Sequence, residues 1–126
     1  MSGNRRFLLD TNAVVSLLAG NRDLAYKLET AEYVGISVIT YLEFLAFDGL
    51  SESDRDCFVR FVELVEVVPL AHDDSGLISK ALDLRMQFRM KLPDAIIGAT
   101  ALFRKSCLIT NDSHFSKVSP LTVHSC

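Results

Sequence analysis

The sequence predicts an α/β fold in which a mainly parallel sheet of about five strands is covered by helices on both faces. Short β-rich apolar segments alternate with longer segments of helical periodicity, an order typical of parallel sheets. Of the 126 residues, 49% are hydrophobic, which is enough to bury a core without staples. No repeat, low-complexity tract or linker interrupts the chain, so we expect a single domain over residues 1–126.

The amino-terminal half is expected to hold two strands and four helices. Residues 6–9 and 34–38 are short apolar runs, and we expect both as strands. Ser51 and Asp54 provide capping chemistry for a helix whose apolar positions keep the helical period. The three earlier helices are expected over residues 11–18, 22–32 and 40–47. Asp48 and Gly49 end the last of these.

The carboxyl-terminal half is expected to add three strands and two helices. A strand over residues 65–70 is terminated by Pro69, and the following helix begins near Asp73. Pro93 suits the first turn of a second helix that runs to about Lys105. This helix is apolar nearly all round, so it should be central. Strands are then expected over residues 107–110 and, at the edge of the sheet, 121–123.

Composition limits the classes of function. The net charge of −3 gives no global basic field, which argues against a sequence-independent DNA coat. Cys57, Cys107 and Cys126 lie far apart without a C-x-x-C pair, so neither a zinc site nor a disulfide framework is expected. No apolar run approaches the ~18 residues that a membrane-spanning helix needs. We therefore expect a cytoplasmic protein without membrane contact.

Four acidic residues are expected at one edge of the sheet. Asp10 closes the first strand, Asp112 lies just past the strand over 107–110, and Glu43 is expected in the first turn of the helix after the second strand. Asp94 opens the apolar helix, which must run antiparallel to the strand that follows it. All four therefore belong at the carboxyl ends of the strands, where ligands bind in open parallel sheets.

Each acid also has a purely structural explanation. Asp10 suits an N-cap, Thr40 with Glu43 fits a capping box, Asp94 suits a first helical turn, and Asp112 suits an Asx turn. Together, however, the four carboxylates repel one another, and no paired lysine or arginine accompanies them. A hard divalent cation, Mg²⁺ or Mn²⁺, would resolve this repulsion.

Four segments carry a family resemblance. They are Phe7 to Asn12 (FLLDTN), Ile36 to Glu43 (ISVITYLE), Lys91 to Ala101 (KLPDAIIGATA) and Leu108 to Phe115 (LITNDSHF). In order and spacing they resemble the motifs of PIN-domain ribonucleases, most closely the VapC toxins of bacterial toxin–antitoxin pairs. The resemblance implies a three-layer α/β/α sandwich, RNA cleavage at a four-acid Mg²⁺ or Mn²⁺ site, homodimerisation and inhibition by an antitoxin protein.

Matched residue by residue, the resemblance makes Asp10, Glu43, Asp94 and Asp112 the catalytic acids and metal ligands. Asp10 and Asp94 are expected as the principal ligands, with Glu43 and Asp112 acting directly or through water. Thr110 and Asn12 are expected to support the ligands by hydrogen bonds. Gly98 stands where alanine is common in the family.

Substrate contacts are less specific in the sequence. Arg85, Arg89 and Lys91 precede Asp94 and are candidates to hold RNA phosphates, although a solvated helix end explains them equally well. His114 adjoins Asp112 and is either a substrate contact or an ordinary loop histidine.

Other classes of protein fit less well. A haloacid dehalogenase-type phosphatase needs a second acid two residues after the first, where Asn12 stands. A receiver domain needs an acidic pair near the end of the first strand and a lysine after the last, and the sequence has neither. The remaining alternative is a catalytically inert PIN-like module that binds RNA or protein.

Overall fold

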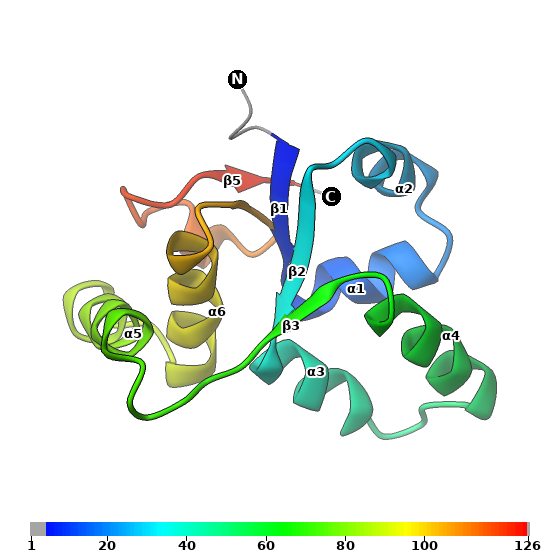
Figure 1. Ribbon diagram of the computed structural model, residues 1–126, viewed down its shortest axis with the longest axis horizontal. Coiled ribbons are helices and arrows are strands. Elements are labelled where there is room, and N and C mark those ends of the chain that lie inside the picture. Colours follow the sequence, from blue (N-terminus) through cyan, green and yellow to red (C-terminus); the bar gives the residue numbers. More distant parts are fainter. Residues whose placement is uncertain (1–4, 126) are drawn as a thin grey trace.

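The computed structural model describes residues 5–125, so Cys126 and residues 1–4 lie outside the described part. Its five strands form one sheet in the order β3-β2-β1-β4-β5, and every neighbouring pair is parallel, as predicted (Figure 1). The strands are β1 (Arg6–Leu9), β2 (Tyr33–Ser37), β3 (Glu66–Val68), β4 (Cys107–Ile109) and β5 (Val123–His124).

Most helices begin at a polar side chain that accepts a hydrogen bond from the first turn. Asp10, Asn21, Ser37, Ser51 and Asp74 each cap a helix in this way. The helices are α1 (Thr11–Leu18), α2 (Arg22–Glu29), α3 (Val38–Leu45), α4 (Glu52–Val62), α5 (Ser75–Phe88), α6 (Leu92–Phe103) and the 3₁₀ turn η2 (Ser113–Phe115). The expected capping chemistry of Ser51 and Asp54 is confirmed as a complete capping box.

The start of α3 corrects one prediction. Ser37 caps this helix by accepting the backbone N–H of Ile39 at 3.0 Å, so α3 begins at Val38 and not at Thr40. The predicted capping box between Thr40 and Glu43 is therefore wrong. Glu43 lies in the second turn of α3, and the Thr40 side chain is fully buried.

Helices cover both faces of the sheet and complete the three-layer α/β/α sandwich (Figure 1). Along β1, Leu8 packs against α5 and α6, whereas Phe7 and Leu9 pack on the opposite face with residues of α1 to α4. This alternation is the period of a strand that is buried on both sides. α6 is buried along most of its length, as its apolar sequence predicts.

The connections create a switch point next to β1. From β1 the chain moves to β2 and β3 on one side, then returns through α5 and α6 to β4 on the other side. α6 runs antiparallel to β4, so its first turn lies at the carboxyl edge of the sheet (Figure 1). In open α/β sheets the crevice at such a switch point is where ligands bind. Asp10 and Asp112 follow the two strands that flank it.

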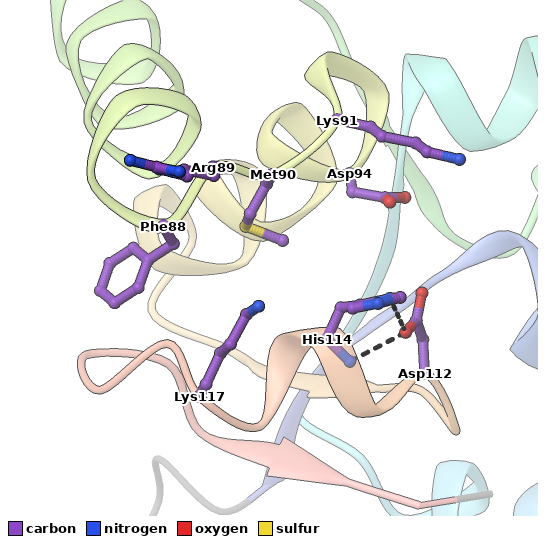
Figure 2. Close-up of a pocket in the computed structure, with 8 residues that line it drawn as sticks. All are labelled: Phe88, Arg89, Met90, Lys91, Asp94, Asp112, His114 and Lys117. Atoms are coloured by element: carbon purple, nitrogen blue, oxygen red, sulfur yellow. Dashed lines mark hydrogen bonds and ion pairs between the residues drawn. The ribbon is translucent and has the colours of Figure 1, made fainter.

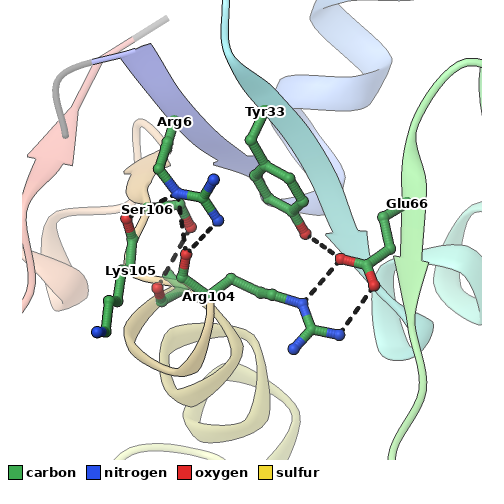
Figure 3. A network of polar contacts seen from close by, with 7 residues as sticks. Arg6, Tyr33, Glu66, Arg104, Lys105 and Ser106 are labelled. Atoms are coloured by element: carbon green, nitrogen blue, oxygen red, sulfur yellow. Dashed lines mark hydrogen bonds and ion pairs between the residues drawn. The ribbon is translucent and has the colours of Figure 1, made fainter. Parts of the chain in front are cut away.

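The opposite edge of the sheet is fixed by a polar clamp (Figure 3). Arg104, at the end of α6, donates two hydrogen bonds of 2.8 Å to the Glu66 carboxylate of β3, and the Tyr33 hydroxyl donates a third at 2.5 Å. The guanidinium group of Arg6 in turn donates to the carbonyls of Arg104 and Lys105. The hydrogen bonds from Arg104 hold the pKa of Glu66 below its usual value. These contacts anchor the carboxyl end of α6 to two strands.

Candidate functional site

Asp10 leaves the sheet at the end of β1 and is almost fully buried. Its Oδ1 accepts the backbone N–H of Ala13 at 2.8 Å, which caps α1, and its Oδ2 accepts the hydroxyl of Thr110. Its own N–H donates to Ile109 of β4 at 3.1 Å. The predicted N-cap role of Asp10 is therefore confirmed, because its side chain caps α1. The predicted support from Thr110 is present as a direct hydrogen bond.

These two donors do not fully compensate the charge of Asp10. Burial raises the pKa of the carboxyl, and the hydrogen bonds from Thr110 and Ala13 lower it. The charges of Asp112 and Asp94 raise the pKa again, and the net direction is upward. The ionised side chain is thus disfavoured by its surroundings, and two of the other acids contribute to that.

Thr110 also ties Asp112 to Asp10. The backbone N–H of Asp112 donates to Thr110 Oγ1 at 3.0 Å, while the same hydroxyl donates to Asp10. Asp112 caps η2, where its Oδ1 accepts the backbone N–H of His114 at 2.9 Å and lies 2.8 Å from Nδ1 of the same histidine. The predicted Asx-type turn is therefore present. The turn and Thr110 together fix where this acid lies.

Glu43 reaches the same region from α3. The Thr11 hydroxyl donates to its Oε1 at 2.5 Å and lies 3.3 Å from the buried hydroxyl of Thr40. Thr11 thus connects the residue after Asp10 to the acid on α3, and its position in the first turn of α1 is set by the cap.

Asp94 lies in the first turn of α6 and is partly buried. Within residues 5–125, no side chain donates a hydrogen bond to its carboxylate. Burial raises the pKa of Asp94, and the charges of Asp112 and Glu43 raise it further, against the lowering effect of Lys91 and His114. Among the four acids, Asp94 therefore has its oxygens least committed to the fold.

The four acids face one cavity of about 280 Å³ at the carboxyl edge of the sheet. Its lining consists of Asp10, Thr11, Asn12, Glu43, Asp94, Ile97, Asp112 and Phe115. Local capping explains the positions of Asp10 and Asp112. It does not explain why four carboxylates from different elements converge on one hollow whose charges raise the pKa of two of them.

The donor set of this cavity fits a hard divalent cation, because it consists of carboxylate, hydroxyl and amide oxygens. In the described part of the chain, however, no three Asp, Glu, His or Cys side chains are already arranged to hold a metal ion. Two of the acids are engaged in other contacts. Asp112 is turned toward His114, and Glu43 accepts a hydrogen bond from Thr11.

Basic residues lie beside the acids, in a second cavity of about 260 Å³ (Figure 2). Arg89, Lys91 and Lys117 line it, and it shares Asp94 and Asp112 with the acid cavity. Arg85 is placed differently. Its guanidinium group donates to the carbonyl of Met90 at 2.8 Å and so holds the loop between α5 and α6.

The sequence indicates only a helix-start hydroxyl for Thr11, leaves His114 open between a substrate contact and an ordinary loop histidine, and does not single out Lys117. Thr11 directly follows Asp10 in the sequence, and both residues line the acid cavity. Lys117 lies three residues beyond His114, one turn further along a tight segment, which brings both to the same side. The positions of the His114 and Lys117 side chains depend on η2, a turn that the sequence did not predict.

Comparisons with known proteins show a family match and several chains of similar fold. The sequence matches the PIN domain over residues 7–120. A toxin–antitoxin complex from Klebsiella pneumoniae contains a chain of similar structure, with 26% identity, a TM-score of 0.74, and coverage of 91% of this chain and 94% of that one. VapBC2 from Rickettsia felis, bound to a promoter DNA fragment, gives 18% identity, a TM-score of 0.80 and coverage of 94% and 97%. DNA-bound VapBC from Salmonella typhimurium contains a chain with 19% identity and a TM-score of 0.75, and the match covers 95% of this chain and 97% of that one. No curated protein matches significantly.

Proposed function

This chain belongs to the PIN domain family, and from that premise we propose that it is a Mg²⁺- or Mn²⁺-dependent ribonuclease of the VapC toxin type. The observation that supports the proposal most strongly is the convergence of Asp10, Glu43, Asp94 and Asp112 on one cavity. The similar solved structures are toxin–antitoxin complexes, which supports the toxin assignment.

In this proposal Asp10 and Asp94 are the principal metal ligands, and Glu43 and Asp112 act directly or through water. A bound divalent cation lowers the pKa of its water and neutralises charge on a phosphodiester. The chain's own contribution is positional. Thr110 holds Asp10, and Thr11 holds Glu43, so that two of the carboxylates keep their places as RNA enters. Asn12 lines the same cavity and supplies a neutral polar group there.

The comparison with toxin–antitoxin complexes supports the proposed antitoxin partner. We infer that a cognate antitoxin inhibits the protein and that the chain forms a homodimer. An apolar cavity of about 300 Å³ borders Glu43 and contains Val15, Leu18, Phe44 and Phe47, a surface suited to an apolar helix of a partner. We also propose that the chain acts as one domain in the cytoplasm. Within residues 5–125, no helix has the length and apolar character needed to cross a bilayer.

Cleavage of transfer RNA and ribosomal RNA in the presence of Mn²⁺ tests the proposal. Wild type should cleave, and Asp94→Asn should lose cleavage because it removes a proposed metal ligand's charge. The variant should stay folded, because within residues 5–125 no side chain donates a hydrogen bond to the Asp94 carboxylate. Asp56→Asn is the matched control, since Asp56 is exposed on α4 and does not line the cavity. It should cleave as wild type does.

A catalytically inert PIN-like module is the competing function. Such a module would bind RNA or protein without cutting, and it would not need four convergent acids. If wild type leaves both RNA classes intact with Mn²⁺ and with Mg²⁺, the inert module is the better description.

A further inference from the structure

We propose that Lys117 binds a phosphate of the RNA strand adjacent to the phosphate that is cleaved. This inference rests on the proposed function and specifies how the substrate is held. The site is the 260 Å³ cavity between the α5–α6 loop and η2, which opens directly beside Asp94 and Asp112 (Figure 2). A strand that places one phosphate at the acids therefore has an adjoining hollow for its neighbour.

Lys117 is held in place by the residues around it. Phe115 and Val118 are each 1% exposed, so the segment is pinned to the core on both sides of the lysine. The backbone N–H of Val118 donates to the carbonyl of Phe115 at 3.1 Å, which tightens this turn further. The lysine itself is exposed, and Figure 2 shows its side chain extending toward the Met90 side of the cavity.

The charge of Lys117 is not used by the fold. Within residues 5–125, no carboxylate lies within ion-pair distance of its ammonium group. The other basic residues nearby are placed differently. Lys91 acts on Asp94 and lowers its pKa, Arg85 is bonded to Met90, and the Arg89 side chain extends away from the acids in Figure 2.

A cation in this cavity would offset the repulsion between an acidic protein and RNA. The net charge of −3 and four carboxylates oppose an RNA strand, so the phosphates beside the scissile one require a local positive charge. An ammonium group binds phosphate as a point charge and tolerates several orientations. His114, whose side chain is 72% exposed, and the apolar Phe88 and Met90 border the same cavity and suit contact with ribose or base.

Salt dependence of RNA cleavage tests the proposal. The substrate is a mixture of heat-denatured transfer RNA and ribosomal RNA with Mn²⁺, and kcat/KM is measured over a series of KCl concentrations. Lys117→Ala should raise KM and flatten the slope of log(kcat/KM) against log[KCl] by about 0.7, the contribution of one phosphate contact on a single strand. Lys117→Arg should keep the wild-type slope. Lys80→Ala, which removes an exposed lysine of α5 outside the cavity, should behave as wild type.

The outcomes separate this proposal from the proposed function. If wild type cleaves and Lys117→Ala retains the wild-type KM and salt slope, the phosphate site is elsewhere while the nuclease assignment stands. If wild type itself does not cleave, the nuclease assignment fails and this proposal fails with it. The unfolding temperature of Lys117→Ala should equal that of wild type, because an exposed unpaired charge contributes little to stability. A lower value would indicate a structural role instead.

Discussion

Asp10 performs two tasks at once, and a substitution can separate them. Its Oδ1 caps α1, a task that asparagine also performs well. The negative charge, by contrast, is disfavoured by burial and by the nearby acids, so the folded-state pKa of Asp10 lies above its ordinary value of 3.8. The capping task needs only an oxygen, whereas holding a metal ion needs the charge.

The pH dependence of stability should reveal this charge. A raised folded-state pKa means that the contribution of Asp10 is fully present below the unfolded-state pKa and is lost as pH rises through the folded-state pKa. In EDTA, the free energy of unfolding of wild type should therefore fall relative to Asp10→Asn as pH rises from acid to neutral. Urea unfolding at a series of pH values measures the difference. Asp94→Asn should show the same sign, since the pKa of Asp94 is also raised. Stability that rises with pH relative to Asp10→Asn would contradict the account.

At the scale of elements, two glycines allow close packing. A Cβ at Gly98 of α6 would lie 3.0 Å from Cδ1 of Leu84, so the glycine lets α5 approach. This explains why a residue that lowers helix propensity by about 1 kcal/mol stands mid-helix. Gly35 of β2 has a stricter role. A Cβ there would lie 2.2 Å from the Tyr33 hydroxyl oxygen, so the tyrosine reaches Glu66 only because position 35 has no side chain.

Gly35→Ala should therefore break the polar clamp. The tyrosine ring must move, and overpacking of this kind costs about 1–3 kcal/mol of unfolding free energy. Tyr33→Phe is the matched comparison. It removes only the hydroxyl, leaves Glu66 paired with Arg104, and should cost about 1 kcal/mol. Chemical unfolding of the two variants gives the comparison. A Gly35→Ala protein as stable as wild type would show that the Tyr33 ring can move aside from position 35 without cost.

For the whole molecule, the sequence predicted the sheet, the alternation of elements and the edge at which the acids gather. These follow from hydrophobic periodicity and from the rule that parallel strands end at a common edge. The misplaced start of α3 shows the limit. Thr40 and Glu43 match a capping box in sequence. However, β2 ends at Ser37, and Ser37 caps α3 three residues earlier than Thr40 would. Several other helix and strand ends also differ from the expected ones by a few residues.

Side-chain directions were the part that sequence could not supply. The hydrogen bonds of Thr11 to Glu43 and of Thr110 to Asp10 join elements that are distant in the chain. The exposed position of Lys117 beside the cavity depends on the burial of Phe115 and Val118 on either side. Such facts arise only once the layers pack, and they determine which of the candidate residues share a cavity.

The central claim is that the four acids form one cation site, and a thermal titration with Mn²⁺ tests it most directly. A cation that binds only the folded state stabilises it by about 2.7 kcal/mol at a hundredfold excess over its Kd. For a chain of this size, that corresponds to a rise in Tm of about 10 °C. We predict a saturable rise for wild type and for Asp56→Asn, and a blunted one for Asp94→Asn. A flat response in wild type, or an equal rise in Asp94→Asn, would contradict the claim.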